Sequence, residues 1–207
     1  VPGAERVLRE WASFAQHASA LGRPRGDAAV IEADEAAFPE IVRRIQPDVV
    51  LLNNLFRDQL DRYGELDAIA TKWRPALQRL PADTTVIVNV DDPTLASLTE
   101  DLAARRIAFG LDDRNPRLLL DQLPHAADAK TCRTCDHALQ YDRLYSAHLG
   151  AWHCPECGAR RPSLDVAGTG LVLRGVDGLS LDVASPEAAS LPVRLEIPGL
   201  YNAYNAV

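Results

Sequence analysis

Four cysteines constrain the fold of this chain more than any other feature of its sequence. They occur as two Cys-x-x-Cys pairs separated by eighteen residues, namely Cys132, Cys135, Cys154 and Cys157. Two residues between the members of a pair let one tight turn present both sulfurs to a single tetrahedral ion, and Gly158 supplies the backbone freedom that the turn needs. The spacing therefore predicts a four-cysteine zinc ribbon inserted at residues 130–162.

The predicted zinc site is structural, because four cysteines close the coordination sphere and leave no position for water or a substrate. The residues expected on a small hairpin between the two pairs are Tyr141, Leu144, Tyr145 and Trp152. Three histidines lie close enough in the sequence to compete as ligands: His137, His148 and His153. With all four cysteines available, we expect these histidines to lie on the surface of the ribbon.

Two other interpretations of the cysteines are less favoured. Disulfides are disfavoured in a cytoplasmic protein, and a redox Cys-x-x-Cys motif would not need the second pair. The cytoplasm is the expected compartment, because no run of the sequence approaches the roughly 20 apolar residues of a membrane-spanning helix. The N-terminus also lacks the basic-then-apolar pattern of a secretory signal.

The composition is that of a soluble globular protein with a sizeable core, since 47% of the 207 residues are hydrophobic and 25% are charged. A formal net charge of -7 argues against a nucleic-acid partner, which usually meets a basic patch. The chain contains no methionine and opens at Val1 without an initiator, so we expect it to be part of a longer protein.

Helical and strand patterns alternate along the first half of the chain, which is typical of a mostly parallel sheet flanked by helices. Helices are predicted at residues 7–21, 38–45 and 66–77 and from residue 93. Strands are predicted at residues 28–31, 48–54, 84–90 and 106–111. After the ribbon, residues 164–166, 170–173, 179–183 and 193–197 read as a small antiparallel sheet that leads into a short C-terminal helix.

Polar residues gather where three of the predicted strands end, at residues 32–35, 53–61 and 89–92. This edge of an open α/β sheet is where ligands bind. The alternative is that the Asp and Asn residues cap the helices that follow. Three such clusters in one chain favour a binding site.

These segments resemble a known family. Residues 32–35, 51–65, 89–93 and 199–205 follow, in order, the central domain of the Mur ligases, and the resemblance covers nearly the whole chain. Within that family, residues 55–65 and the inserted ribbon are most similar to the Mur-ligase-type subunit of lipid II isoglutaminyl synthase. The resemblance implies that residues 1–207 are part of a P-loop type ATP-binding domain.

The resemblance also implies a reaction: ATP-dependent amidation of the α-carboxylate of D-glutamate in lipid II, through an acyl phosphate, to give D-isoglutamine for peptidoglycan synthesis. Ammonia would come from a glutaminase-type amidotransferase subunit, in a heterodimer or larger complex, and lipid II would be met at the membrane face. Two alternatives stay open, a Mur-type ligase that adds an amino acid to a carboxylate and a non-enzymatic zinc-ribbon binding module.

The resemblance assigns expected roles to four residues. Glu32 matches the magnesium-binding glutamate of the family, and Gln59 stands where most Mur ligases have a metal-binding histidine. An amide oxygen can still contact Mg²⁺, directly or through water. Asn205 matches the asparagine that contacts the adenine, and Asn202 is its neighbour on the same turn, although Tyr201 replaces the family's usual histidine.

Other family features are absent from the sequence or weakly matched. No Gly-rich loop ends in Gly-Lys-Ser/Thr, and the family places that loop before Val1 and the C-terminal domain beyond Val207. We therefore expect the main catalytic segments to lie outside the chain and residues 1–207 alone not to turn over. Lys72 falls near a lysine that several Mur ligases carbamoylate, but a solvated surface lysine is the simpler interpretation.

Overall fold

One mixed sheet of six strands runs through the part of the chain that the computed structural model describes, residues 26–56, 65–125 and 127–207. Its strands, in spatial order, are β1 (Val49–Leu52), β2 (Thr85–Asn89), β3 (Arg105–Leu111), β6 (Val166–Leu173), β7 (Leu179–Ala184) and β8 (Leu191–Leu195). The first four are parallel to one another, and the ladders from β6 to β7 and from β7 to β8 are antiparallel.

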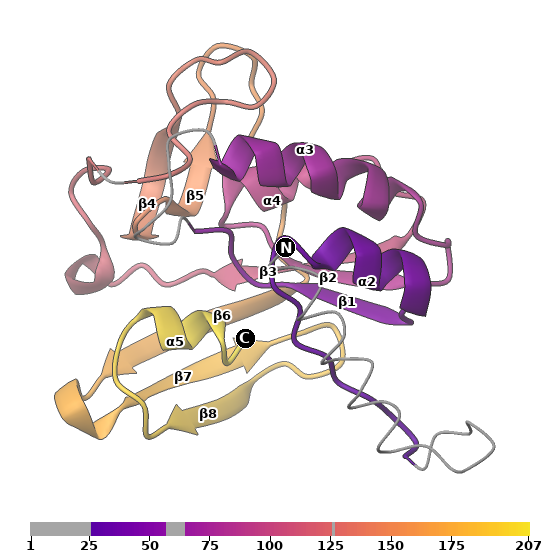
Figure 1. The fold of residues 1–207 in the computed structure, drawn as a ribbon. Coiled ribbons are helices and arrows are strands. Elements are labelled where there is room, and N and C mark those ends of the chain that lie inside the picture. The colour runs from indigo at the N-terminus through magenta and orange to yellow at the C-terminus, as the bar shows by residue number, and fades with distance from the viewer. Residues whose placement is uncertain (1–25, 57–64, 126) are drawn as a thin grey trace.

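Three helices cover one face of the parallel strands (Figure 1): α2 (Phe38–Ile45), α3 (Glu65–Gln78) and α4 (Pro93–Leu98). Alternate residues of β2 point toward these helices, so Val86 and Val88 are fully buried in a core that includes Leu77 and Leu95. On β1 the opposite face stays open, because Val49 and Leu51 are more than half exposed. In the described residues, the helices therefore cover one side of this half of the sheet.

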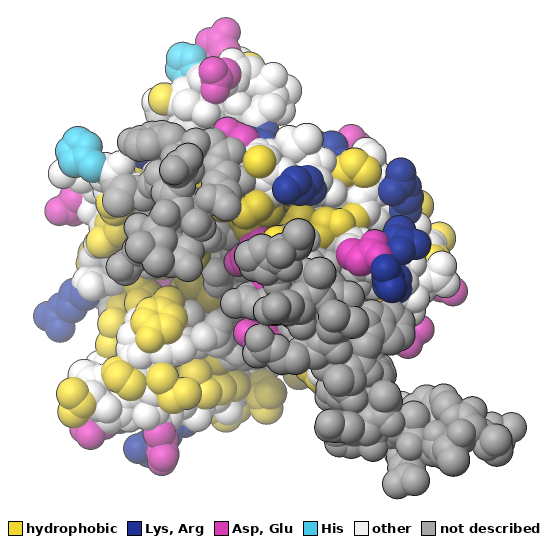
Figure 2. Space-filling view, viewed as in Figure 1, with side chains coloured by type: hydrophobic (Ala, Val, Ile, Leu, Met, Phe, Trp, Pro, Cys, Tyr) yellow, Lys and Arg dark blue, Asp and Glu magenta, His cyan; other side chains and the backbone are white. Residues whose placement is uncertain are grey.

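The second half of the sheet has its own core. It is formed by β6, β7, part of β8 and the short helix α5 (Tyr201–Tyr204), and it includes Leu111, Leu179 and Tyr204. Two short 3-10 helices, η1 (Pro116–Leu118) and η2 (Gly175–Asp177), occupy connections. Figure 2 shows hydrophobic side chains gathered over α5 and the strands below it, where Tyr201 and Leu191 are among the exposed apolar residues.

The predicted hairpin is present and touches both cores. It consists of β4 (Gln140–Ser146) and β5 (Leu149–His153), which pair antiparallel as a separate two-stranded sheet. Trp152 belongs to the core under α2–α4, whereas Tyr145 and Leu149 belong to the core of the C-terminal strands. The ribbon is therefore packed into the body of the molecule on two sides.

The predicted fold class is confirmed, with differences in detail. Helix α2 has the predicted bounds, while α3 and the strands β1, β2 and β3 differ from prediction by a few residues at their ends. Residues 164–166 and 170–173 were predicted as two strands, but the structure has one strand, β6, which begins at Val166 and whose irregular pairing lies near Gly170 at φ 59°. The antiparallel strands also join the parallel ones through the β3–β6 ladder.

The buried strand predicted at residues 28–31 was wrong. No strand is assigned there, and Val30 is fully exposed. A strand needs a neighbour for its backbone N–H and C=O groups, and among the described residues β1 is the end of the ladder order. The helix predicted at residues 7–21 lies outside the described residues.

No helix of the described residues is both long enough and apolar enough to cross a membrane.

Candidate functional site

The carboxyl ends of β1 and β2 bring two of the three predicted polar clusters to one edge of the sheet. Asn53 follows β1, and residues 89–92 close β2. Helix α5 comes from the other half of the sheet and reaches the same edge, where Asn53 Nδ2 donates to Asn205 Oδ1 at 2.6 Å. Residues 152 positions apart in the sequence thus meet at the strand ends.

Asp91 is a fully buried carboxylate that is hydrogen-bonded on both oxygens. Its Oδ1 accepts from Arg161 Nη1 at 2.6 Å, and its Oδ2 accepts from Tyr204 Oη at 2.8 Å and from the backbone N–H of Leu111 at 3.0 Å. Burial raises the pKa of the Asp91 carboxyl above its ordinary value, and the nearby guanidinium of Arg161 opposes that rise. The carboxylate therefore depends on Arg161 for its charge compensation.

Asp92, the next residue, is also fully buried but serves the start of a helix. Its Oδ1 accepts from the backbone N–H groups of Thr94 at 2.8 Å and Leu95 at 3.2 Å, so it is the N-cap of α4. Its Oδ2 accepts from the backbone N–H of Leu55 at 3.0 Å. Asp92 thereby fixes the chain just after β1 against the start of α4.

Three asparagine side chains form a chain of amides at the strand ends. Asn205 Nδ2 donates to Asn202 Oδ1 at 3.0 Å, and Asn202 Nδ2 donates to the carbonyl oxygen of Pro198 at 2.8 Å. Asn53 supplies the third amide through its bond to Asn205. Within the described residues, the buried Oδ1 of Asn53 and the buried Nδ2 of Asn89 have no hydrogen-bond partner. One buried acceptor and one buried donor at this edge are therefore left unsatisfied by the described residues.

The first polar cluster divides between an exposed carboxylate and a turn that leads into α2. Glu32 is exposed in the segment before α2. Asp34 Oδ1 accepts from the backbone N–H of Ala37 at 2.8 Å, so its side chain stabilises the turn before α2, whose N-cap residue Ala37 has no side-chain cap. Gln59, predicted as a second magnesium contact, lies outside the described residues, and so does most of the cluster at residues 53–61.

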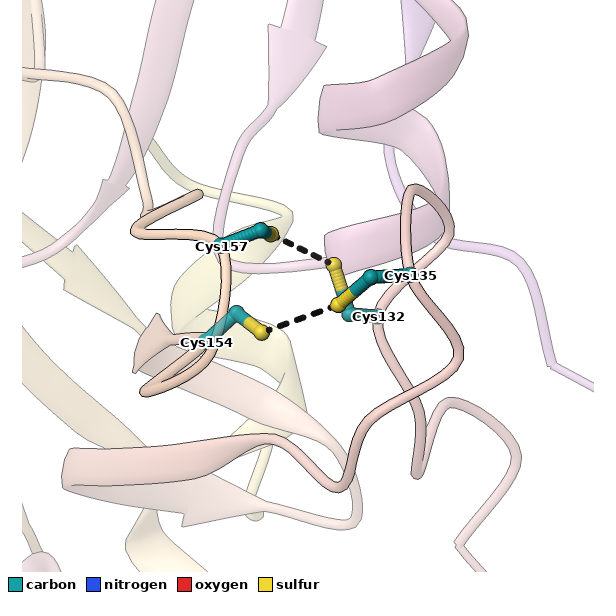
Figure 3. Close-up of side chains that lie close together, drawn as sticks. All are labelled: Cys132, Cys135, Cys154 and Cys157. Atoms are coloured by element: carbon teal, nitrogen blue, oxygen red, sulfur yellow. Dashed lines mark hydrogen bonds between the residues drawn. The ribbon is translucent and has the colours of Figure 1, made fainter.

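The four cysteine thiols converge on one point, as Figure 3 shows. Their sulfurs all lie within 4.8 Å of one another, and the Cys132–Cys157 and Cys135–Cys154 pairs are 3.5 Å apart. A tetrahedral zinc ion at about 2.3 Å from each thiolate places the sulfurs about 3.8 Å apart, so the cluster could hold such an ion. All four cysteines are free thiols, which leaves no disulfide.

The thiols of the cluster differ in acidity: although backbone hydrogen bonds oppose the shift, burial and the neighbouring sulfurs raise the pKa of Cys135 and of Cys157 above the ordinary value. Burial opposes ionisation of Cys132, but hydrogen bonds from the backbone N–H groups of Thr134 and Cys135 lower the pKa of its thiol to about 7. The thiolate is the species that binds metal. The residue types and their separation thus fit one structural zinc ion.

The expectation that all three nearby histidines lie on the surface was wrong for one of them. His137 is exposed and His153 is half-buried, but His148 is fully buried. Its Nε2 lies 3.4 Å from Asp92 Oδ2, and its ring stacks at a tilt on Phe56 with centroids 4.9 Å apart. The β4–β5 turn carries His148 inward because that turn packs on the strand ends.

Two residues of this site were not identified from the sequence. Arg161 follows the second cysteine pair beside the exposed Arg160, and no local pattern distinguishes the two. Tyr204 lies in the C-terminal segment that resembles the family, where the resemblance assigned roles to the asparagines alone. Both are recognised by their shared partner Asp91, which is 70 residues before Arg161 and 113 before Tyr204.

A family comparison decides the relationship of the chain. The family model described as the Mur ligase middle domain matches residues 12–145, well over half of the chain. The chain belongs to the Mur ligase family. The predicted resemblance is thereby confirmed.

Within the Mur ligase family, the chain is similar to MurT subunits. The chain is 33% identical over 180 residues to the MurT subunit of lipid II isoglutaminyl synthase (glutamine-hydrolyzing) from Streptococcus pneumoniae, covering 86% of this chain and 38% of that protein. It is 27% identical over 192 residues to the MurT subunit from Staphylococcus aureus strain COL, covering 89% and 39%. The chain thus spans about two fifths of the length of these relatives.

A solved structure shares the fold of this Mur ligase domain. A pseudomurein peptide ligase type C from Methanothermus fervidus superposes with a TM-score of 0.69 at 22% identity, covering 89% of this chain and 35% of that one. At this identity the likeness shows the fold alone.

Proposed function

We propose that this chain is the middle part of a ligase that amidates a carboxylate at the expense of ATP. The substrate is the α-carboxylate of D-glutamate in the lipid II stem peptide, and the product is D-isoglutamine. The observation that carries the proposal is the 33% identity to a MurT subunit over 86% of the chain. The zinc ribbon and the strand-end polar residues lie within that Mur ligase framework.

The reaction proceeds in two steps. A carboxylate oxygen of the substrate attacks the γ-phosphorus of ATP, ADP leaves, and an acyl phosphate forms. Ammonia then attacks the carbonyl carbon, phosphate leaves with the bonding electrons, and the amide remains after loss of a proton. Ammonia is supplied by a glutaminase partner subunit, and lipid II is met at the cytoplasmic face of the membrane.

The strand-end amides are the nucleotide-binding candidates of this chain. Asn202 and Asn205 are held by a chain of hydrogen bonds, and the buried Oδ1 of Asn53 has no partner in the described residues. An adenine presents both donors and acceptors on its edge, which suits amide side chains. In this proposal these residues orient the base.

The proposed enzyme would bind two kinds of metal ion at separate sites. A magnesium ion would neutralise phosphate charge, and Glu32, an exposed hard oxygen ligand, would bind it together with Gln59. Zinc would sit among Cys132, Cys135, Cys154 and Cys157 and take no part in the chemistry, because four thiolates leave it no open position.

The test uses the full-length gene product co-expressed with its glutaminase partner. Lipid II, ATP, Mg²⁺ and glutamine are supplied, and mass spectrometry follows the conversion of one carboxyl to an amide. Amide formation is expected, with a loss of at least tenfold in rate for Glu32→Gln and no change for the exposed control Glu187→Gln.

Other outcomes would move the protein to another class. ATP-dependent addition of an amino acid, with no amide formed, would place it among the peptide-forming Mur ligases. No ATP consumption at all, with zinc bound, would leave the zinc-ribbon binding module.

A further inference from the structure

The ribbon and helix α5 come from different parts of the chain, and they meet on one buried carboxylate. Asp91 Oδ1 accepts from Arg161 at 2.6 Å, and Asp91 Oδ2 accepts from Tyr204 at 2.8 Å. The Asp91 side chain has no exposed surface, and that of Arg161 is 11% exposed. A buried ion pair of this kind holds its partners in one geometry, because either charge alone would be uncompensated.

The second cysteine pair sets the position of Arg161. The backbone N–H of Cys154 donates to the carbonyl oxygen of Ala159 at 2.7 Å, and the backbone N–H of Gly158 donates to the carbonyl oxygen of Cys154 at 3.1 Å. The backbone N–H of Arg161 then donates to the carbonyl oxygen of Trp152 at 2.9 Å. The guanidinium also donates to the carbonyl oxygen of Leu111 at 2.9 Å. Arg161 is thus anchored at its backbone and at its tip.

Helix α5 cannot hold its own position. It has four residues, and a helix so short has no stability of its own. Its N-cap, Leu200, offers no side-chain hydrogen bond. The helix is fixed by tertiary contacts, among them the hydrogen bond from buried Tyr204 to Asp91, which connects α5 to Arg161 of the ribbon.

We propose that Arg161 is a positioning residue for the nucleotide-binding end of the fold. The ribbon holds Arg161, Arg161 holds Asp91, and Asp91 holds Tyr204 together with α5, which carries Asn202 and Asn205. The inference rests on the proposed role of these two asparagines in nucleotide binding. It gives the zinc ribbon, which has no open coordination position, a task in the site through a defined line of contacts.

Three variants separate the links of this line. Arg161→Met leaves the buried carboxylate of Asp91 without a counter-charge. Arg161→Lys keeps the charge but loses the planar fork that reaches Asp91 and Leu111 together. Tyr204→Phe removes a single hydrogen bond and leaves the ribbon untouched. One exposed neighbour serves as the matched control, Arg160→Met beside Arg161.

The experiment uses the full-length, zinc-loaded protein and measures three quantities: zinc per chain, the dissociation constant of Mg²⁺-ATP by calorimetry, and hydrogen exchange of the α5 amides without nucleotide. Arg161→Met and Tyr204→Phe are expected to weaken ATP binding about tenfold and to speed α5 exchange about tenfold, with zinc retained. Arg161→Lys is expected to be intermediate. The control Arg160→Met is expected to change neither quantity by more than about twofold.

Each outcome bears on the inference. Suppose that Arg161→Met and Tyr204→Phe fold and bind zinc. If their α5 amides then exchange at the parent's rate and they bind ATP with the parent's affinity, the proposed positioning role of Arg161 is overturned. If Arg161→Met fails to fold, Arg161→Lys and Tyr204→Phe carry the test. If the parent binds no nucleotide, the proposed function fails, while faster α5 exchange in Arg161→Met would still support the line from ribbon to helix.

Discussion

At the scale of residues, the two neighbouring carboxylates after β2 hold different parts of the molecule. Asp91 joins the ribbon to α5, and Asp92 joins the start of α4 to the chain after β1. Both side chains are fully buried, and each of their oxygens has a partner. Such groups tolerate little change, because a buried carboxylate that loses its partners carries the full cost of its desolvation.

The space around Asp91 leads to a prediction for Gly110. A Cβ added at Gly110 would lie 2.5 Å from Asp91 Oδ1, and the carboxylate cannot withdraw without breaking its bonds to Arg161 and Tyr204. Gly110→Ala is expected to lower the free energy of unfolding by about 2 kcal/mol or more. Chemical denaturation measures it, with Gly26→Ala as the control, since the nearest atom there lies 3.4 Å away. Equal stability of Gly110→Ala and the parent would contradict the packing.

At the scale of elements, the strands and helices around the site are short and depend on the side chains at their ends. Helix α4 has six residues and begins on the cap by Asp92, and α5 has four residues without a side-chain cap. Helix α2 ends at Ile45. Its C-cap residue, Gln46, lies in the left-handed region at φ 49° and immediately precedes Pro47. Caps and turns therefore decide where the elements around the strand ends begin and stop.

The stability of the fold is expected to depend on Asp92, the N-cap of α4. Asp92→Ala removes the acceptor for Thr94 and Leu95 and leaves the buried N–H of Leu55 without a partner. The expected loss in free energy of unfolding is about 2–4 kcal/mol, from a lost cap together with an unsatisfied buried donor. Urea denaturation measures it beside Asn115→Ala, the exposed cap of η1, which should cost about 1 kcal/mol or less. Similar losses in the two variants would refute the special place of Asp92.

At the scale of the whole molecule, the ribbon connects two cores. Trp152 packs in the core under α2–α4 and donates to the carbonyl oxygen of Val90 at 3.0 Å. Tyr145 packs in the core of the C-terminal strands and donates to the carbonyl oxygen of Asp113 at 2.7 Å. Since the hairpin between the cysteine pairs carries both residues, the cysteine cluster and the two halves of the sheet should lose structure together.

Removing the metal tests this connection. Zinc bound to the native state alone stabilises it by about 4 kcal/mol at a thousand times its dissociation constant. A chelator under reducing conditions is expected to lower the Tm of the full-length protein and to change the fluorescence of Trp152 in the same transition. Cys157→Ser should behave like the chelated protein, and Thr134→Ser should keep its zinc. An unchanged Tm after verified zinc loss would show that the ribbon does not join the cores.

Local pattern in the sequence determined the ribbon, the helix at residues 38–45, the strands β1 to β3 and the α/β class, because cysteine spacing and hydrophobic periodicity act over a few residues. The tertiary structure decided the rest. The β3–β6 ladder joins strands that lie on either side of the ribbon in the sequence. Val30 is exposed instead of lying in the predicted strand, and His148 is buried instead of lying on the surface. The role of Arg161 depends on a carboxylate 70 residues away, and a charge is buried only where a partner compensates it. Sequence could therefore point to the edge of the sheet, whereas only the packed chain shows which side chains meet there.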